Sequence, residues 1–548
     1  MTEAVGVVDD LAMGDPYDPW LALRAVGLLR DFNRAGVVSA ADVHVAQALG
    51  RLGEESDERV LLALALAVRG VRLGSVCVLL DDVRHAVAPA DAETRADALA
   101  WPDATDWRAA CAASPLVAVG DGRDPADHHG RPLRLVDDLL YLDRYWRQEE
   151  VVRTELELRA QRGGPVVDVG ALRDGLARLF PAPAPDRQRL AATMTVLRYD
   201  SIIAGGPGTG KTTTVARLIA LLRSLPGDPP RVALAAPTGK AAARLQEAVT
   251  AESSASGLGI GDVTASTLHR LLGWRPGSRN HFLHDRANRL PYDVVVVDES
   301  SMVSLTLMSR LLEALRPDAR LVLVGDPDQL ASVEAGAVLG DLVARSAAPG
   351  QRPPALLGEL VGADLASGEQ SSDEVRNGVV RLTETHRFGH AIGALAAAIQ
   401  DDDADRVLGL LRSGDDAMSF RESADGAVLG REQVAGLRTD VVATAEALGE
   451  AAAAGDAVAA LAGLERHRLL CAHRHGPYGV SRWTWEIDAW LAAELGDYTV
   501  GGEWYLGRPL LITGNDYDLD LFNGDTGVVV RGADGPVAAF GRGAEPIL

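Results

Sequence analysis

The chain has 548 residues, 47% of them hydrophobic, and a formal net charge of −23. This length predicts several domains with packed cores, and the acidity argues against DNA binding through a global positive field. The sequence has no long apolar run, no basic and then apolar N-terminus, and only three scattered cysteines. We therefore expect no membrane span, no secretion signal and no disulfide framework, and we expect a cytoplasmic protein.

Residues 1–115 are rich in Ala, Leu, Val and Arg, and their apolar residues follow helical spacing. No catalytic pattern occurs there, so we predict a helical domain that packs or docks on a partner. Residues 116–185 are expected to form a hairpin and helix connector. Its hairpin strands would be 133–136 and 139–142, and its helix would span 145–158.

From residue 186 the sequence alternates strand, loop and helix, which predicts an α/β fold with a parallel sheet. Residues 186–350 are expected to form the first lobe, because four short apolar runs suit strands that are buried on both faces. Residues 351–500 are expected to hold a linker and a second lobe. Residues 501–548 are expected to be β structure, with a turn at 523–525.

The phosphate-binding pattern G-x-x-x-x-G-K-[ST] occupies 205–212, after an apolar run and before a helical one. Its glycines let backbone N–H groups surround phosphates at a helix N-terminus. Lys211 would reach the β- and γ-phosphates of ATP, and Thr212 would ligate Mg²⁺. Of the 54 basic residues only Lys211 and Lys240 are lysines, which indicates a need for a compact ammonium, or else chance survival, at these positions.

Two acidic residues, Asp298 and Glu299, follow a run of four valines. Asp298 is expected to hold Mg²⁺ and Glu299 to orient the attacking water. After another apolar run, Gln329 is a candidate sensor of the γ-phosphate. Arg387, beyond the linker, is either an arginine finger on that phosphate or a residue without this role, since spacing alone does not decide.

Two further clusters have alternative interpretations. His467, Cys471, His473 and His475 resemble metal ligands, but the alternation at 469–472 favours a buried strand instead. Three tryptophans at helical spacing are expected to pack in a core rather than to stack on bases: Trp483, Trp485 and Trp490.

The ordered set of segments resembles superfamily 1 DNA helicases, and among them the RecD family, the alpha subunits of exodeoxyribonuclease V. The resemblance covers 186–400 and 465–530 and includes these segments: 186–188, the P-loop at 205–212, 236–245, 267–273, 298–302, 325–330, 385–387, 507–509 and 515–527. It implies two RecA-like lobes with ATP between them and a small Src-homology-3-like barrel after residue 500.

The resemblance also implies roles for individual residues. Gln188 would read the adenine edge, and Arg387 would be the finger from the second lobe. The phosphate cradle would comprise Gly205, Gly206, Pro207, Gly208, Thr209, Gly210, Lys211, Thr212 and Thr213. Four residues would hold the phosphates of a single strand without sequence choice: Thr238, Lys240, Thr267 and His269.

The implied activity is an ATP-dependent 5′–3′ DNA helicase that acts on DNA ends within a heterotrimer with RecB-like and RecC-like subunits. Nuclease activity would belong to a partner, since this chain has no cluster of Asp, Glu and Lys suited to cleavage. The family has two further helicase segments after the barrel, and neither occurs before Leu548. The alternative is therefore a regulatory subunit that binds ATP without turnover.

Overall fold

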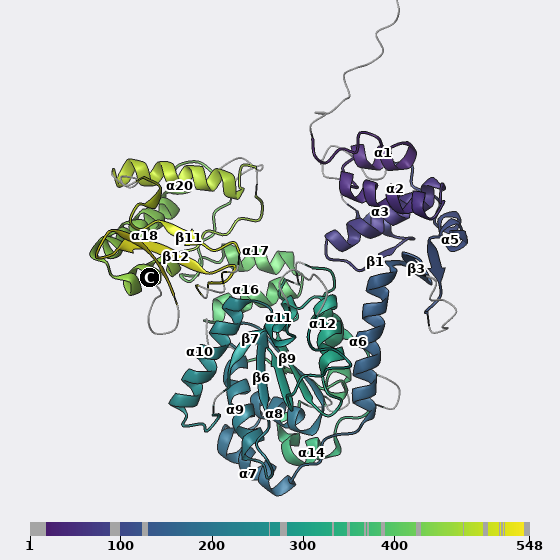
Figure 1. Ribbon diagram of the computed structural model, residues 1–548. Helices are drawn as coiled ribbons and strands as arrows, with labels where there is room; N and C mark the ends of the chain where they lie inside the picture. Colours follow the sequence, from purple (N-terminus) through teal and green to yellow (C-terminus); the bar gives the residue numbers. More distant parts are fainter. Residues whose placement is uncertain are drawn as a thin grey trace, which may run out of the picture. The chain divides into compact units, whose positions relative to one another are not determined.

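The computed structural model describes the greater part of the chain (Figure 1). The described residues are 18–87, 99–122, 130–261, 263–274, 282–330, 332, 334–347, 351–366, 369, 372–384, 389–422, 429–474, 476–496, 502–514, 516, 519 and 521–541. None of the helices in these ranges is long and apolar enough to cross a bilayer.

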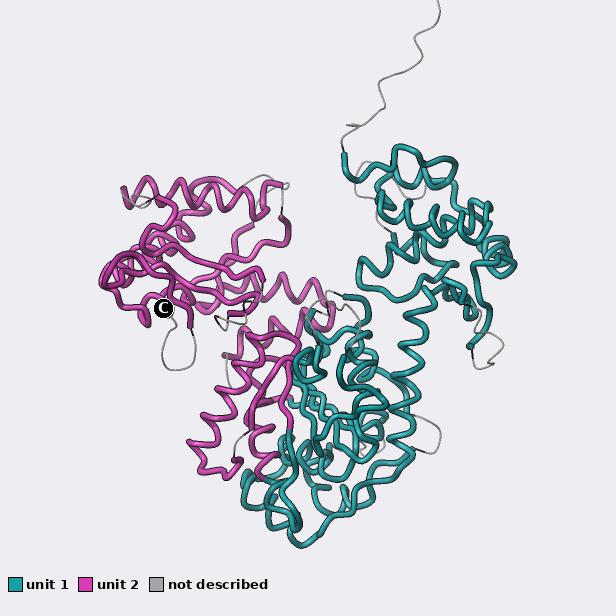
Figure 2. The backbone as a smooth tube through the Cα atoms, in the orientation of Figure 1, with its two compact units in different colours: residues 1–205, 221–232, 268–382 teal, residues 206–220, 233–267, 383–548 magenta. Residues whose placement is uncertain are grey.

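The chain divides into two compact units, which Figure 2 colours teal and magenta. The first unit contains residues 1–205, 221–232 and 268–382. The second contains residues 206–220, 233–267 and 383–548.

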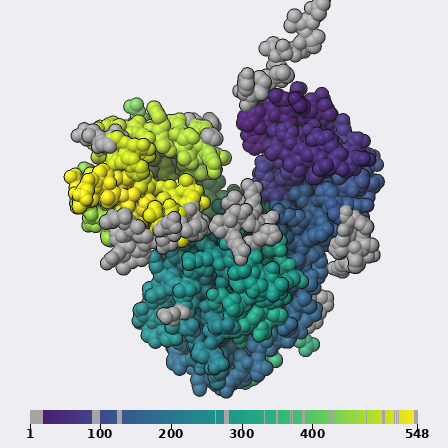
Figure 3. Space-filling model, in the orientation of Figure 1, coloured from purple at the N-terminus to yellow at the C-terminus, as the bar shows by residue number. Residues whose placement is uncertain are grey.

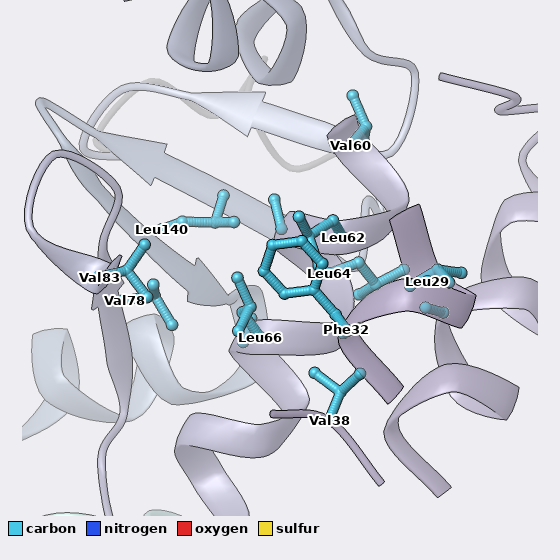
Figure 4. Packing of buried hydrophobic residues seen from close by; sticks show 14 of the residues in the cluster. Leu29, Phe32, Val38, Val60, Leu62, Leu64, Leu66, Val78, Val83 and Leu140 are labelled. Atoms are coloured by element: carbon cyan, nitrogen blue, oxygen red, sulfur yellow. The ribbon is translucent and has the colours of Figure 1, made fainter. Parts of the chain in front are cut away.

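The first unit begins with a helical module whose core surrounds one central helix. Its helices are α1 (Gly27–Arg34), α2 (Ala40–Leu52), α3 (Glu58–Arg72), α4 (Val83–Ala86) and α5 (Ala104–Ala113). In α3 the run from Leu62 to Ala67 is wholly buried, as expected for a helix that is apolar on nearly all sides. Phe32 packs against this helix (Figure 4). The helical prediction for this region is confirmed.

A four-stranded sheet completes this module in the order β1-β4-β3-β2. Its strands are β1 (Cys77–Leu79), β2 (Val117–Val119), β3 (Leu133–Val136) and β4 (Leu139–Leu142). β3 and β4 pair antiparallel, so the predicted hairpin is confirmed. β1 was not predicted, because three residues are too few to give an alternating pattern.

The helix α6 (Asp143–Gln161) begins directly after β4. Its first residue, Asp143, accepts a 2.7 Å hydrogen bond from Nε of Arg134, and both side chains are buried. This ion pair fixes the helix start against the sheet. Figure 3 shows the surface of this module, purple to blue, continuing into the residues of α6.

A six-stranded sheet follows in the order β10-β5-β9-β8-β6-β7. Its strands are β5 (Asp200–Gly205), β6 (Val232–Ala236), β7 (Ala265–Thr267), β8 (Val294–Val297), β9 (Arg320–Gly325) and β10 (Val379–Leu382). The pairs β10–β5, β5–β9, β8–β9 and β6–β7 are parallel. Every residue of β5, β6 and β8 is buried, which confirms the predicted parallel α/β fold.

Helices lie before and between these strands, and those between them provide the crossovers that parallel pairing requires. They are α7 (Val169–Leu179), α8 (Arg187–Leu197), α9 (Lys211–Ser224), α10 (Gly239–Ala255), α11 (Leu268–Leu271), the 3₁₀ turn η3 (Ser300–Met302), α12 (Leu305–Ala314) and α13 (Val338–Ala344). Figure 1 shows α6 running alongside α12. The side chains of Gln148 and Thr306 join these two helices by a 2.9 Å hydrogen bond.

The first lobe does not end at residue 350, the boundary that the composition predicted. The chain continues through α14 (Ala355–Val361), η4 (Gly362–Asp364) and α15 (Asp373–Arg376) into β10, which pairs with β5. The Pro/Gly/Ser-rich composition of 346–376 concealed these short elements. The other predicted domain boundaries stay predictions.

The second unit ends in several helices and a small antiparallel sheet, on which two of these helices pack. The helices are α16 (His390–Gln400), α17 (Ala404–Arg412), α18 (Ala435–Ala454), α19 (Ala457–Glu465), α20 (Val480–Glu494) and the 3₁₀ turn η7 (Gly502–Trp504). The sheet has the order β11 (Pro509–Leu511), β12 (Thr526–Arg531), β13 (Pro536–Phe540). Leu448 and Leu464 form its core with Val528 and Val530.

In this unit two sequence predictions are wrong and a third stays a proposal. Among the described residues between Leu382 and Pro509 no strand occurs, so a second RecA-like lobe stays a proposal. The buried strand predicted at 469–472 is wrong, because this segment is irregular and Leu470 is 89% exposed. Trp490 is buried and contacts Trp483, whereas Trp485 is exposed, so core packing was wrong for Trp485.

Candidate nucleotide and DNA site

The P-loop connects β5 to α9. Gly208 and Gly210 have φ angles of 78° and 81°, a left-handed conformation that glycine adopts without steric cost. The Nζ of Lys211 donates a 3.0 Å hydrogen bond to the carbonyl of Gly206, and the hydroxyl of Thr209 donates to the same carbonyl at 2.9 Å. These contacts hold the loop in a closed turn with the lysine amine over it.

A buried threonine fixes the helix that follows the P-loop to the end of the loop. Thr214 is fully buried, and its hydroxyl donates a 2.9 Å hydrogen bond to the carbonyl of Gly210. Thr212 and Thr213, in contrast, are half-buried. The P-loop is therefore followed by a 14-residue helix whose start is held in place. The N–H groups and the dipole at this N-terminus favour binding of an anion.

Asp298 and Glu299 follow β8 directly. Glu299 has a φ of 49°, an unusual left-handed conformation for a residue with a side chain. Its N–H donates a 2.9 Å hydrogen bond to Oδ1 of Asp298. The hydroxyl of the next residue, Ser300, donates to the carbonyl of Val324 in β9 at 2.8 Å. The acidic pair is thus held in a defined turn rather than in a solvated loop.

Gln329 lies in the loop after β9. Its Nε2 donates a 3.1 Å hydrogen bond to Oδ2 of Asp326, which is 4% exposed. Oδ1 of Asp326 also accepts from the N–H of Asp328 at 3.1 Å. Because β8, β9 and β5 are parallel neighbours, their carboxyl ends meet at one edge of the sheet, the edge at which such sheets bind ligands.

Gln188 lies in the first turn of α8, and its side chain is half-buried. Asp186 caps this helix by accepting hydrogen bonds from the N–H groups of Gln188 and Arg189. The arginines on either side of Gln188 make ion pairs, Arg187 with Glu369 and Arg189 with Asp364. These supporting residues were not predictable from the sequence, because their acidic partners lie about 180 residues away in the chain.

Three of the four predicted DNA contacts lie in or beside the strands β6 and β7. Thr238 caps α10 by accepting a hydrogen bond from the N–H of Ala241, and Thr267 ends β7. The Nζ of Lys240 lies 3.5 Å from the carbonyl oxygen of Gly524, in the predicted turn at 523–525. Lys240 therefore has a contact within its own unit that the sequence did not indicate.

His269 lies in α11 between two aromatic rings. Its ring centroid is 6.5 Å from that of Trp274 and 6.1 Å from that of Phe282. Burial lowers the pKa of His269 below its usual value, and the charge of Glu334 opposes this only partly. Its imidazole is therefore neutral at neutral pH, which the sequence alone did not indicate. The remaining predicted residue, Arg387, lies outside the described residues.

A parallel sheet, a glycine-rich loop before a helix and an acidic strand end define a P-loop nucleotide-binding domain. Two family models match the chain. One, described as an AAA domain, matches residues 188–335, and one, described as the N-terminal domain of the RecBCD enzyme subunit RecD, matches residues 34–141.

Two relatives match nearly the whole chain, and a third matches more than half of it. The RecBCD enzyme subunit RecD of Mycobacterium tuberculosis is 49% identical over 96% of this chain and 83% of its own length. The RecBCD enzyme subunit RecD of Mycolicibacterium smegmatis is 49% identical over 92% of this chain and 82% of its own length. The ATP-dependent RecD2 DNA helicase of Deinococcus radiodurans is 32% identical over 60% of this chain and 36% of its own. The chain belongs to the RecD family of helicase subunits.

Proposed function

We propose that this chain is an ATP-dependent 5′–3′ DNA translocase and helicase that works with RecB-like and RecC-like subunits on DNA ends during recombinational repair. The observation that carries the proposal is the P-loop, with Lys211 at the start of α9 and its amine over the loop. The names of the relatives support it, since they describe RecD subunits of RecBCD and an ATP-dependent DNA helicase.

The P-loop would bind the phosphates of ATP through residues 205–213. Lys211 neutralises charge on the β- and γ-phosphates, and backbone N–H groups at the start of α9 add to this. Thr212 and Asp298 supply oxygen ligands of the type that Mg²⁺ prefers. When bound, Mg²⁺ would neutralise charge that develops on the phosphates. Gln188, held in place by the ion pairs of Arg187 and Arg189, would contact the adenine.

Hydrolysis would depend on three further side chains. Glu299 orients the attacking water, and its fixed turn after β8 limits the positions that its carboxylate can take. Gln329, held on Asp326, would exchange that hydrogen bond for one to the γ-phosphate when ATP is present. Arg387 would act as an arginine finger from a second RecA-like lobe, an effect worth about 10³–10⁵ in rate.

The DNA strand would contact Thr238, Lys240, Thr267 and His269. All but His269 lie at or just after the carboxyl ends of β6 and β7. Hydroxyl, ammonium and imidazole groups of this kind bind backbone phosphates without reading sequence. The sheet of β11, β12 and β13 would form part of an SH3-like barrel. The helical module at the N-terminus would dock on a partner subunit, and the acidity of this chain fits a DNA channel that partners help to build.

The test is ATP hydrolysis by the protein assembled with its partner subunits, measured with and without single-stranded DNA. A Lys211→Gln subunit should lose the DNA-stimulated turnover contributed by this chain. Arg217→Gln is the matched control, because Arg217 lies in the same helix and pairs with Glu252 at 3.5 Å. Nucleotide binding that is unchanged by DNA, with no turnover lost in Lys211→Gln, would favour the regulatory alternative.

A further inference from the structure

We propose that a cavity between the N-terminal module (α1 to α6 with β1 to β4) and the α/β module (α11 to α13 with the strands β8 and β9) binds one nucleotide of single-stranded DNA. The cavity has a volume of about 330 Å³ and lies entirely within the first unit. This volume is at the lower end of the range typical of small-ligand pockets. The inference rests on the proposed function, because it adds a DNA contact from a module that has no helicase motif.

Three arginines from three different helices line the cavity: Arg72 of α3, Arg144 of α6 and Arg310 of α12. Arg72 pairs with Asp42 at 2.8 Å, and Arg310 pairs with Glu313 at 3.0 Å. Each guanidinium has five N–H donors, so these pairs orient the two side chains and leave further donors for a ligand.

Arg144 differs from the other two arginines because it has no acidic partner among the described residues. Its guanidinium lies 5.6 Å from the ring centroid of its neighbour Tyr145. Within the described part of the chain, the only acidic residue that lines the cavity is Glu334. A group of arginines with one carboxylate favours an anion, and in a chain of net charge −23 such a place is a local exception. Guanidinium groups suit a phosphate, which they bind through paired hydrogen bonds.

The same cavity is lined by three rings, those of Tyr145, His269 and Phe282. His269 and Phe282 are in contact, and burial lowers the pKa of His269, which keeps its imidazole uncharged. Aromatic rings beside basic groups are the usual elements of a single-strand site, since bases stack on the rings while the phosphates pair with arginine. The chemistry therefore matches a nucleotide better than a free phosphate, which would need no aromatic surface.

Direct hydrogen bonds between the two modules hold the walls of the cavity in place. Gln148 of α6 accepts from Thr306 of α12 at 2.9 Å. The N–H of Gly336 donates to the carbonyl of Gly74 at 3.0 Å. The site is thus formed before DNA arrives, and binding need not order these side chains anew.

The experiment measures the affinity of the full-length chain for fluorescein-labelled oligo-dT by anisotropy over a series of salt concentrations. The Arg144→Gln/Arg310→Gln double variant should bind about tenfold more weakly. Its slope of log K against log salt should fall by about 0.7 for each phosphate that the variant no longer neutralises. Arg153→Gln is the matched control. Arg153 also lies in α6, but it pairs with Glu150 and Glu157 and does not line the cavity.

A second measurement addresses the rings. Oligo-dT with a single 5-iodo-deoxyuridine should crosslink under ultraviolet light to Tyr145 or Phe282. The cavity site would be overturned by an unchanged salt slope in the double variant or by the absence of crosslinks to both Tyr145 and Phe282. If the wild-type complex still shows DNA-stimulated turnover, the proposed function would not be affected by either result. A wild-type complex whose ATP turnover does not respond to single-stranded DNA would overturn both this inference and the proposed function.

Discussion

Arg189 donates two hydrogen bonds to the carboxylate of Asp364, from Nε to Oδ2 at 2.7 Å and from Nη2 to Oδ1 at 2.6 Å. Asp364 is 1% exposed, and its Oδ1 also accepts from the N–H of Asp186. This ion pair joins the start of α8, which carries Gln188, to the segment that leads into β10. It explains why residues 355–382 belong to the first lobe.

Removing one partner of this pair should be costly, because a buried carboxylate would then lack its counter-charge. We expect Arg189→Met to lower the free energy of unfolding by about 3–5 kcal/mol, measured by urea denaturation of the full-length chain. Arg173→Met is the control, since Arg173 pairs with Glu359 on the surface at 3.1 Å. Exposed pairs of this kind contribute about 0–1 kcal/mol. Equal losses in the two variants would contradict this assignment.

Lys211→Arg tests the need for a compact ammonium in the P-loop. A planar guanidinium is wider and does not fit a loop that already directs the lysine amine onto the carbonyl of Gly206. We expect the turnover of this subunit to fall by about 10²–10³, the usual loss when one preorganised donor to a transition state is removed. Single-turnover hydrolysis of radiolabelled ATP measures this directly, and near-normal rates would contradict the assigned role.

Lys240→Arg should behave differently, because either cation can pair with a backbone phosphate. We expect a less than about threefold change in affinity for single-stranded DNA, whereas Lys240→Met should lower the slope of its salt dependence by about 0.7. The contact with the carbonyl of Gly524 can be kept by arginine but not by methionine. A severe turnover defect in Lys240→Arg with normal DNA affinity would show that Lys240 has another role.

Glu149 in α6 should make stability depend on pH. Burial raises the pKa of Glu149 to about 7, the charges of Asp341 and Glu150 add to this, and a hydrogen bond from Tyr141 opposes it. Between its ordinary pKa of 4.5 and about 7 the folded chain binds more protons than the unfolded chain. The free energy of unfolding therefore falls as pH rises through this window, and it stays lower above it.

Glu149→Gln removes the titration and keeps an oxygen that accepts from Tyr141. We expect this variant to gain about 1–2 kcal/mol over wild type at pH 8 and little at pH 5, after allowance for solvent screening. Denaturant titrations at the two pH values provide the measurement. Glu157→Gln, which removes an exposed ion pair with Arg153, should change stability by a similar small amount at both pH values.

The sequence predicted those parts of the fold that short-range patterns determine. Buried strands such as β5 and β8 are continuous apolar runs, and the P-loop has a fixed spacing of glycines before Lys211. The position of β10 was not predictable in this way, because it depends on ion pairs such as Arg187–Glu369 between residues 182 positions apart. The exposure of Trp485 was missed for a similar reason, since helical spacing alone does not tell which face of α20 is covered.

The direction of movement on DNA distinguishes a 5′–3′ translocase from the regulatory alternative. The assembled complex would be given ATP and single-stranded oligonucleotides with streptavidin bound at a biotin on either the 5′ or the 3′ end. We expect displacement of streptavidin from the 3′ end, and loss of that displacement in Lys211→Gln but not in Arg217→Gln. Displacement from the 5′ end only, or displacement that survives Lys211→Gln, would contradict this expectation.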